Sequence, residues 1–258
     1  MFAPLNPPVR DWPARRVWIV GASSGIGAAL ADHLLQRGAR VALSARRADA
    51  LESVAAGRSA AVGVAFVAAG PAAGARAHGT LPGQGSDIDL VVFCAARYQP
   101  EHAWELQAER VRATIATNLE AVYFGLETVL PRLLAARRGG VVLLASVAGY
   151  TGLPTATVYG PTKAALINLG ELLHAELRPR GLGVYLVNPG FVRTRLTERN
   201  GFPMPALQTP QQAAEAIVHG LERGRFEIHF PRRFTVAMQL LRRLPYRWRF
   251  AILRRVMG

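Results

Sequence analysis

Residues 17–27 read VWIVGASSGIG, an apolar run followed by glycines at positions 21, 25 and 27. The β-branched run predicts a strand over 17–20, and the periodicity that follows predicts a helix over about 25–37. Glycines let the chain turn tightly and let other groups approach the backbone closely. The turn therefore presents its amide N–H groups and the positive end of the helix to an anion, although an ordinary strand-to-helix turn has the same local pattern.

Further along the chain, short apolar runs alternate with segments of helical period, which predicts βα units and a parallel sheet. The strand candidates are almost continuously apolar, as expected for strands covered on both faces, and they span 17–20, 40–44, 62–67, 88–93, 140–145, 183–187 and 226–230. Helices are expected at about 25–37, 48–56, 103–137 as one piece or broken, 157–178 and 210–222. The sequence predicts an α/β fold without internal repeats.

The composition is that of a soluble globular protein, with 50% of the 258 residues hydrophobic and 19% charged. A chain of this length can bury one sizeable core. Its single cysteine, Cys94, excludes an internal disulfide and a cysteine-cluster metal site, and it suits a reducing compartment. No apolar run reaches the roughly 18 residues needed to span a bilayer. We therefore expect a cytoplasmic protein without a metal site.

The chain is expected to divide into three regions. Residues 1–15 hold four prolines and lack an apolar centre, which predicts a mobile tail and not a secretory signal. Residues 16–231 form the α/β domain, and residues 232–258 form a basic amphipathic helical extension. The net charge is +14, and residues 223–258 alone hold ten arginines against one glutamate.

The basic extension is predicted to contain two helices, about 232–244 and 246–257, separated by Pro245. Its apolar residues recur at helical spacing with arginine at other positions: Phe234, Ala237, Met238, Leu241, Trp248, Ile252 and Val256. Such a segment could dock against the protein's own pocket or a sister subunit, or lie peripherally on an anionic membrane surface. Nucleic-acid binding is disfavoured, because no recognised nucleic-acid module accompanies the charge.

The only lysine of the chain, Lys163, stands four residues after Tyr159, whereas the other thirty strongly basic positions are arginines. Positions i and i+4 share one face of a helix, so the phenol and the ammonium can be held side by side. A neighbouring cation favours the phenolate and lowers the pKa of a tyrosine. A lysine can also pass a proton, which arginine cannot do near neutral pH. The pair is therefore a candidate for acid–base chemistry.

Together with this pair, a glycine-rich turn at the start of a βα pattern indicates a dinucleotide site. Its candidate phosphate contacts are Gly21, Ser23, Ser24, Gly25, Ile26 and Gly27. At the end of the second predicted strand, an acidic residue would bind the ribose 2′-OH of NAD and a basic one the 2′-phosphate of NADP. Here Ser44-Ala45 is followed by Arg46 and Arg47, so NADP(H) is favoured over NAD(H). A solvated helix start is the plainer alternative for these arginines.

These motifs together resemble the short-chain dehydrogenase/reductase family. The resemblance covers about residues 15–222 and is carried by the glycine pattern, Asn118 in ATNL, Ser146 in LASVAG, Tyr159-x3-Lys163 and NPGFVRT at 188–194. It implies a single-domain, Rossmann-like doubly wound parallel sheet of about seven strands flanked by helices, with the site at the carboxyl ends of the strands. It also implies a homo-oligomer, either a dimer or a tetramer.

The resemblance implies a role for each matching residue. Tyr159 is the general acid or base, Lys163 lowers its pKa and contacts the nicotinamide ribose, Ser146 holds the carbonyl oxygen, and Asn118 helps anchor a water. Contacts with the cofactor are expected from Ala95, Pro189, Gly190, Val192 and Thr194. The predicted function is an NADP(H)-dependent oxidoreductase that interconverts a carbonyl compound and an alcohol. Phe202, Met204 and Leu207 suggest an apolar lid and hence a hydrophobic substrate.

Two departures from the family pattern concern the adenosine half of the cofactor site. The family usually has Asn-Asn-Ala-Gly after strand four, where this chain reads Phe93-Cys94-Ala95-Ala96, and it usually has an Asp after strand three, where residues 66–69 read FVAA. A nucleotide-binding sensor or scaffold that lost turnover is therefore the alternative function. A sugar-nucleotide epimerase or dehydratase is disfavoured, because 258 residues leave little room for a larger C-terminal substrate domain.

Overall fold

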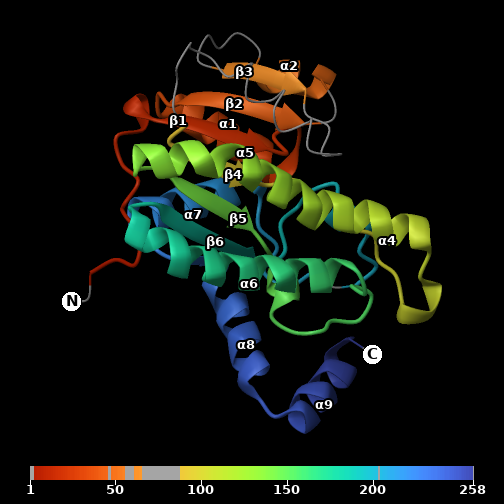
Figure 1. The fold of residues 1–258 in the computed structure, drawn as a ribbon. Helices are drawn as coiled ribbons and strands as arrows, with labels where there is room; N and C mark the ends of the chain where they lie inside the picture. The colour runs from red at the N-terminus through yellow and green to blue at the C-terminus, as the bar shows by residue number, and fades with distance from the viewer. Residues whose placement is uncertain (1–2, 46–47, 56–60, 66–87, 203, 258) are drawn as a thin grey trace.

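The computed structural model describes residues 3–45, 48–55, 61–65, 88–202 and 204–257. Their centre is a seven-stranded parallel sheet with the order β3-β2-β1-β4-β5-β6-β7 (Figure 1). The strands are β1 (Arg16–Val20), β2 (Arg40–Ala45), β3 (Ala61–Ala65), β4 (Leu90–Phe93), β5 (Gly140–Leu144), β6 (Gly183–Pro189) and β7 (Glu227–Phe230). The order reverses direction between β1 and β4, so the predicted doubly wound Rossmann-like sheet is confirmed.

Helices cover both faces of the sheet because successive strand residues point to opposite sides. In β1, Val17 and Ile19 enter one buried cluster, while Trp18 and Val20 enter the other. The first cluster also takes residues of α1 (Gly25–Gln36), α2 (Ala48–Ala55) and α7 (Pro210–Glu222). The second takes residues of α5 (Ala121–Ala136) and α6 (Tyr159–Leu177). Both faces are therefore apolar, as the continuous apolar strands predicted.

The long helix expected at 103–137 is broken. A 3-10 turn at Ala103–Glu105 precedes α4 (Ala108–Ile115), and a π-helical turn at Ala116–Glu120 joins α4 to α5. Asn118 lies in that π-helical turn and is fully buried. π-Helical turns within helices are often found at functional sites.

The expectation of a mobile tail at residues 1–15 is wrong for residues 3–15. The buried Asn6 side chain donates to the carbonyl oxygen of Val184 at 2.6 Å and accepts from its amide at 3.0 Å. Trp12 is also buried, and its indole N–H donates to Glu222 at 2.9 Å. Asn6 therefore fixes the segment to β6, and Trp12 fixes it to α7. Both partners lie more than 170 residues away along the chain.

The basic extension forms two helices, α8 (Arg232–Arg243) and α9 (Tyr246–Met257). In Figure 1, α8 leaves the body next to α6, and α9 continues at an angle beyond it. Thr235 and Met238 of α8 are buried against the body, whereas Ala237, which was expected on the same apolar face, is exposed. Among the described residues, no helix is both long and apolar enough to cross a membrane.

Candidate active site

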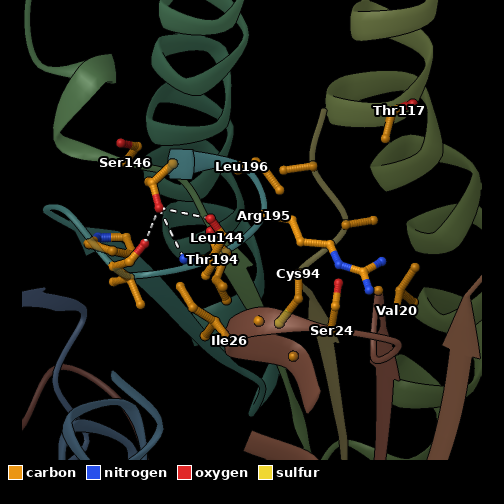
Figure 2. A pocket seen from close by; sticks show the side chains of 18 of the residues that line it. Val20, Ser24, Ile26, Cys94, Thr117, Leu144, Ser146, Thr194, Arg195 and Leu196 are labelled. Atoms are coloured by element: carbon orange, nitrogen blue, oxygen red, sulfur yellow. Dashed lines mark hydrogen bonds between the residues drawn. The ribbon is translucent and has the colours of Figure 1, made fainter. Parts of the chain in front are cut away.

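A cavity of about 660 Å³ opens at the carboxyl ends of β1, β4, β5 and β6 (Figure 2). The predicted site residues that line it are Gly21, Ser23, Ser24, Gly25, Ile26, Gly27, Ala95, Ser146, Tyr159, Lys163, Pro189, Gly190, Val192 and Thr194. Residues that were not singled out line it as well, among them Thr117, Arg195, Leu196 and Thr197. The topology therefore gathers residues from seven separate parts of the chain at one edge of the sheet.

The glycine-rich turn leaves no room for side chains. A Cβ on Gly21 would lie 2.4 Å from the backbone nitrogen of Ala95, and Gly21 has a φ of +94° that favours glycine. A Cβ on Gly27 would lie 2.2 Å from the carbonyl oxygen of Gly21. Ser24 then precedes α1 in an extended conformation, so the helix N-terminus faces the cavity. This arrangement fits the phosphates of a dinucleotide, because free amides and the helix dipole meet there.

Tyr159 opens α6, and Lys163 lies one turn later on the same face, as predicted. The Lys163 ammonium nitrogen is 5.5 Å from the centre of the Tyr159 ring. Lys163 is almost completely buried and donates to the carbonyl oxygen of Leu144 at 2.7 Å. Ser146 follows the end of β5, where its hydroxyl accepts from the amide of Ala148 at 3.1 Å. Tyrosine, lysine and serine therefore converge on one wall of the cavity.

The expected direction of the Tyr159 pKa is wrong for this structure. Burial raises the pKa of Tyr159 to about 12, and a hydrogen bond with Ser146 opposes the rise only in part. Burial also lowers the pKa of Lys163 to about 8. Desolvation is the largest cause of both shifts, because both groups lie away from water. At neutral pH the phenol therefore keeps its proton and can donate it.

Asn118 does not line the cavity. Its side-chain oxygen accepts from the amide of Arg97 at 2.6 Å, and its amide group donates to the carbonyl oxygen of Arg97 and to the hydroxyl of Thr162, both at 3.0 Å. Thr162 in turn donates to the carbonyl oxygen of Tyr159 at 2.8 Å. Asn118 therefore ties the segment after β4 to the first turn of α6, and its neighbour Thr117 faces the cavity (Figure 2).

Thr197 holds the turn that contains Val192 and Thr194. Its hydroxyl accepts from the amide of Thr194 at 3.0 Å and lies 2.8 Å from the carbonyl oxygen of Val192, to which it can donate. Dashed lines in Figure 2 mark the bonds that end on Thr194. These hydrogen bonds could have been predicted from the sequence, because a Thr hydroxyl in a turn often forms hydrogen bonds with backbone groups about three residues earlier.

Arg195 is the one charged side chain among the lining residues that the sequence analysis did not weigh. In Figure 2 it extends across the cavity towards Ser24 at the start of α1. Within the described ranges it forms no ion pair with an acidic residue. The predicted 2′-phosphate contacts, Arg46 and Arg47, and the segment 66–69 that lacks the usual Asp lie outside the described residues.

Phe93 and Cys94, at the end of β4, stand where the family usually has two asparagines, and Ala95 keeps the family's alanine. Burial raises the pKa of the Cys94 thiol to about 12, so the sulfur stays protonated and acts as a small packed group. Ala95 lies against Gly21, as the 2.4 Å approach of a Cβ shows. The small residues therefore preserve the close contact between β1 and β4 without supplying the side-chain hydrogen bonds of asparagine.

Aromatic rings contact one another close in sequence or in space to residues that line the cavity. The ring centre of Phe191 lies 5.8 Å from that of Phe202 and 5.3 Å from that of Phe234 in α8. The ring centre of Tyr98 lies 4.9 Å from that of Tyr159. An aromatic ring against Tyr159 and aromatic residues next to the cavity-lining Gly190 and Val192 suit a substrate with an apolar body.

Comparison with known proteins agrees with this geometry. Residues 15–202 match the family described as short chain dehydrogenase. The chain is 35% identical over 237 residues to an uncharacterized oxidoreductase of Myxococcus xanthus, covering 90% of this chain and 93% of that protein. A short-chain dehydrogenase of Sphingobium yanoikuyae, solved in complex with NADPH, is similar with a TM-score of 0.77 and 26% identity, over 90% of this chain and 97% of that one.

A second solved structure supports the fold alone. The 3-ketoacyl-(acyl-carrier-protein) reductase of Brucella melitensis, complexed with NADH, has a TM-score of 0.78 at 22% identity, over 86% of this chain and 99% of that one. The protein belongs to the short-chain dehydrogenase/reductase family. It is an oxidoreductase with an NAD(P)-binding Rossmann fold.

Proposed function

We propose that the protein is an NADP(H)-dependent oxidoreductase that interconverts a ketone or aldehyde with an alcohol, on a hydrophobic substrate. The observation that carries the proposal is the convergence of Tyr159, Lys163 and Ser146 beside a glycine-lined cavity. The nicotinamide, when bound, supplies or accepts the hydride. The protein has to hold the carbonyl oxygen, deliver a proton to it and keep water away.

The side chains of the site divide this work among them. In reduction, Tyr159 gives its phenolic proton to the substrate oxygen as the C–H bond forms at the carbonyl carbon, and the carbonyl becomes an alcohol. The hydroxyl of Ser146 donates to the same oxygen and orients it. Lys163, buried at 5.5 Å from the Tyr159 ring, stabilises the phenolate that remains. In oxidation, the same phenolate takes the proton back.

The preference for NADP(H) is supported by charge. No acidic residue stands in Ser44-Ala45-Arg46-Arg47, where NAD-binding chains carry a carboxylate. Guanidinium groups suit phosphate because they donate in a planar fork. The NADPH complex of the similar Sphingobium yanoikuyae enzyme supports the same choice.

A panel of apolar carbonyl compounds and alcohols, followed at the nicotinamide absorbance with both cofactors, tests the activity and the preference together. Tyr159→Phe is expected to reduce turnover at least about 1,000-fold while NADPH still binds, because it removes only the proton donor. Tyr98→Phe is the matched control, since it removes a hydroxyl from the ring in contact with Tyr159. Equal turnover of the two variants would refute the role of Tyr159.

A sensor or scaffold without turnover is the second candidate, favoured by the changed segment Phe93-Cys94-Ala95-Ala96. It predicts that NADPH binds with no activity on any member of the panel. We further propose a cytoplasmic homo-oligomer, either a dimer or a tetramer. Sedimentation equilibrium would measure its mass, and a monomer at micromolar concentration would contradict that part of the proposal.

A further inference from the structure

The C-terminal helical pair, α8 and α9 (residues 232–257), leaves much of its apolar surface uncovered. In α8, Thr235 and Met238 are buried against the body. In α9, Leu253 is the only buried side chain among the residues whose burial is described. The α/β domain therefore covers one face of α8 and very little of the surface of α9.

The uncovered side chains are large and apolar. Trp248 is 66% exposed and Val256 74% exposed, values unusual for such residues in a soluble domain. Other exposed members of the pair are Val236, Leu240, Leu244, Tyr246, Phe250 and Ile252. A cluster of exposed large apolar side chains often marks a surface that binds a partner.

The charge of the pair has a single sign. Residues 232–257 contain eight arginines and no aspartate or glutamate. At about 100° per residue, Arg247, Arg254 and Arg255 share one side of α9, and apolar residues occupy most of the remaining circumference. Trp248, Ile252 and Val256 form an exposed apolar strip beside these arginines, an arrangement typical of segments that lie in a membrane interface.

The angle between the two helices is built into the structure. Arg249 of α9 donates to the backbone carbonyl oxygens of Arg242 and of Leu244, the latter at 3.0 Å. Its guanidinium also lies 4.7 Å from the centre of the Tyr246 ring. Arg249 therefore binds the end of α8 across the Pro245 bend, which holds the exposed face of α9 in a defined orientation.

We propose that the C-terminal helical pair binds the surface of an anionic lipid bilayer. A second copy of this chain is a poor occupant, because contact between two such pairs would bring sixteen arginines together without a carboxylate. An anionic bilayer can bind both kinds of side chain. Its headgroups pair with the arginines, and the exposed rings are buried at the boundary with the acyl chains. The pair is attached at the site, since Phe234 at the start of α8 lies 5.3 Å from Phe191 between ring centres.

Vesicle flotation of the full chain tests this proposal. We expect the protein to float with vesicles of phosphatidylcholine mixed with phosphatidylglycerol, and to stay in the bottom fraction with phosphatidylcholine alone. The triple variant Arg247→Glu, Arg254→Glu, Arg255→Glu should weaken binding by at least about 100-fold, because each basic residue near an anionic surface strengthens binding about fivefold. High salt should also weaken vesicle binding by the wild type, because it screens the attraction between the arginines and the anionic headgroups.

The matched control is Arg40→Glu, Arg180→Glu, Arg223→Glu. These arginines are exposed: Arg40 begins β2, and Arg180 and Arg223 stand before β6 and β7, at the sheet edge opposite the cavity. The control changes net charge equally, so it should float nearly as the wild type does. Trp248→Ala should also weaken flotation, and circular dichroism should show unchanged folding in every variant.

Three outcomes would overturn the proposal. The first is absence of flotation with anionic vesicles, and the second is equal loss in the two triple variants, which would reduce the effect to net charge. The third is a wild-type protein that does not float but forms a concentration-dependent dimer or binds random-sequence RNA, with that association lost in the α9 triple variant. That result would assign the surface to a second copy or to a nucleic acid.

Discussion

Asn118→Ala separates a structural role for this residue from a role in the chemistry. The family resemblance predicts that Asn118 anchors a water in a proton relay, but in the structure its side chain forms three hydrogen bonds with protein groups. All three bonds would be lost in the variant, which leaves the amide and carbonyl of Arg97 and the hydroxyl of Thr162 without this partner. Buried bonds of this kind contribute about 1 kcal/mol each.

The expected loss of stability is therefore about 3 kcal/mol. For a domain of this size, that corresponds to a fall in the melting temperature of roughly 6–12 °C. Urea unfolding followed by circular dichroism would measure the free energy. Thr162→Val removes one of the three partners and should cost about 1 kcal/mol, and the double variant should cost less than the sum of the two, because the residues share a bond.

A loss of stability below about 0.5 kcal/mol together with a large loss of turnover would refute this reasoning. It would mean that Asn118 acts in the reaction and that the bonds to Arg97 and Thr162 contribute little to the fold. A loss of stability with turnover retained at low temperature would support a positioning role, through the Thr162 hydroxyl that holds the carbonyl oxygen of Tyr159.

Three further predictions follow from the geometry of the site. Reduction should slow as pH rises through about 8, because Lys163 loses its proton there while Tyr159 keeps its own up to about 12. A flat profile of kcat/KM between about pH 7 and 9 would contradict the role given to Lys163. Arg195→Ala should raise the Kd of NADPH about tenfold by fluorescence titration, because charge-assisted bonds to phosphate are worth roughly 1.5–3 kcal/mol. The Kd of nicotinamide riboside, which carries no phosphate, should change little, and equal effects on both ligands would exclude a phosphate contact. Thr197→Val should weaken NADPH binding several-fold while Thr197→Ser restores it, since the serine hydroxyl can still bond to Thr194.

Much of the fold and the site was predictable because the signals are local. Continuous apolar strands, the glycines at 21, 25 and 27, and the four-residue spacing of Tyr159 and Lys163 each depend on backbone geometry within a few residues. Parallel strands then bring their carboxyl ends to one edge, so motifs distant in sequence were expected to meet. The seven-stranded sheet and the shared cavity agree with that expectation.

Other features depended on contacts that no short stretch of sequence encodes. The rise of the Tyr159 pKa follows from burial by the assembled site, which exceeds the opposing effect of the hydrogen bond to Ser146. The placement of Asn118 outside the cavity, and the anchoring of Asn6 to Val184, depend on partners from separate elements.

For the C-terminal helices, the sequence by itself determined an arginine-rich amphipathic pattern, because helical periodicity is a local property. Only the tertiary structure decided which apolar face is covered. Met238 of α8 finds a place against the body, while Trp248 and Val256 of α9 do not, because the bend at Pro245 carries α9 beyond the body's surface.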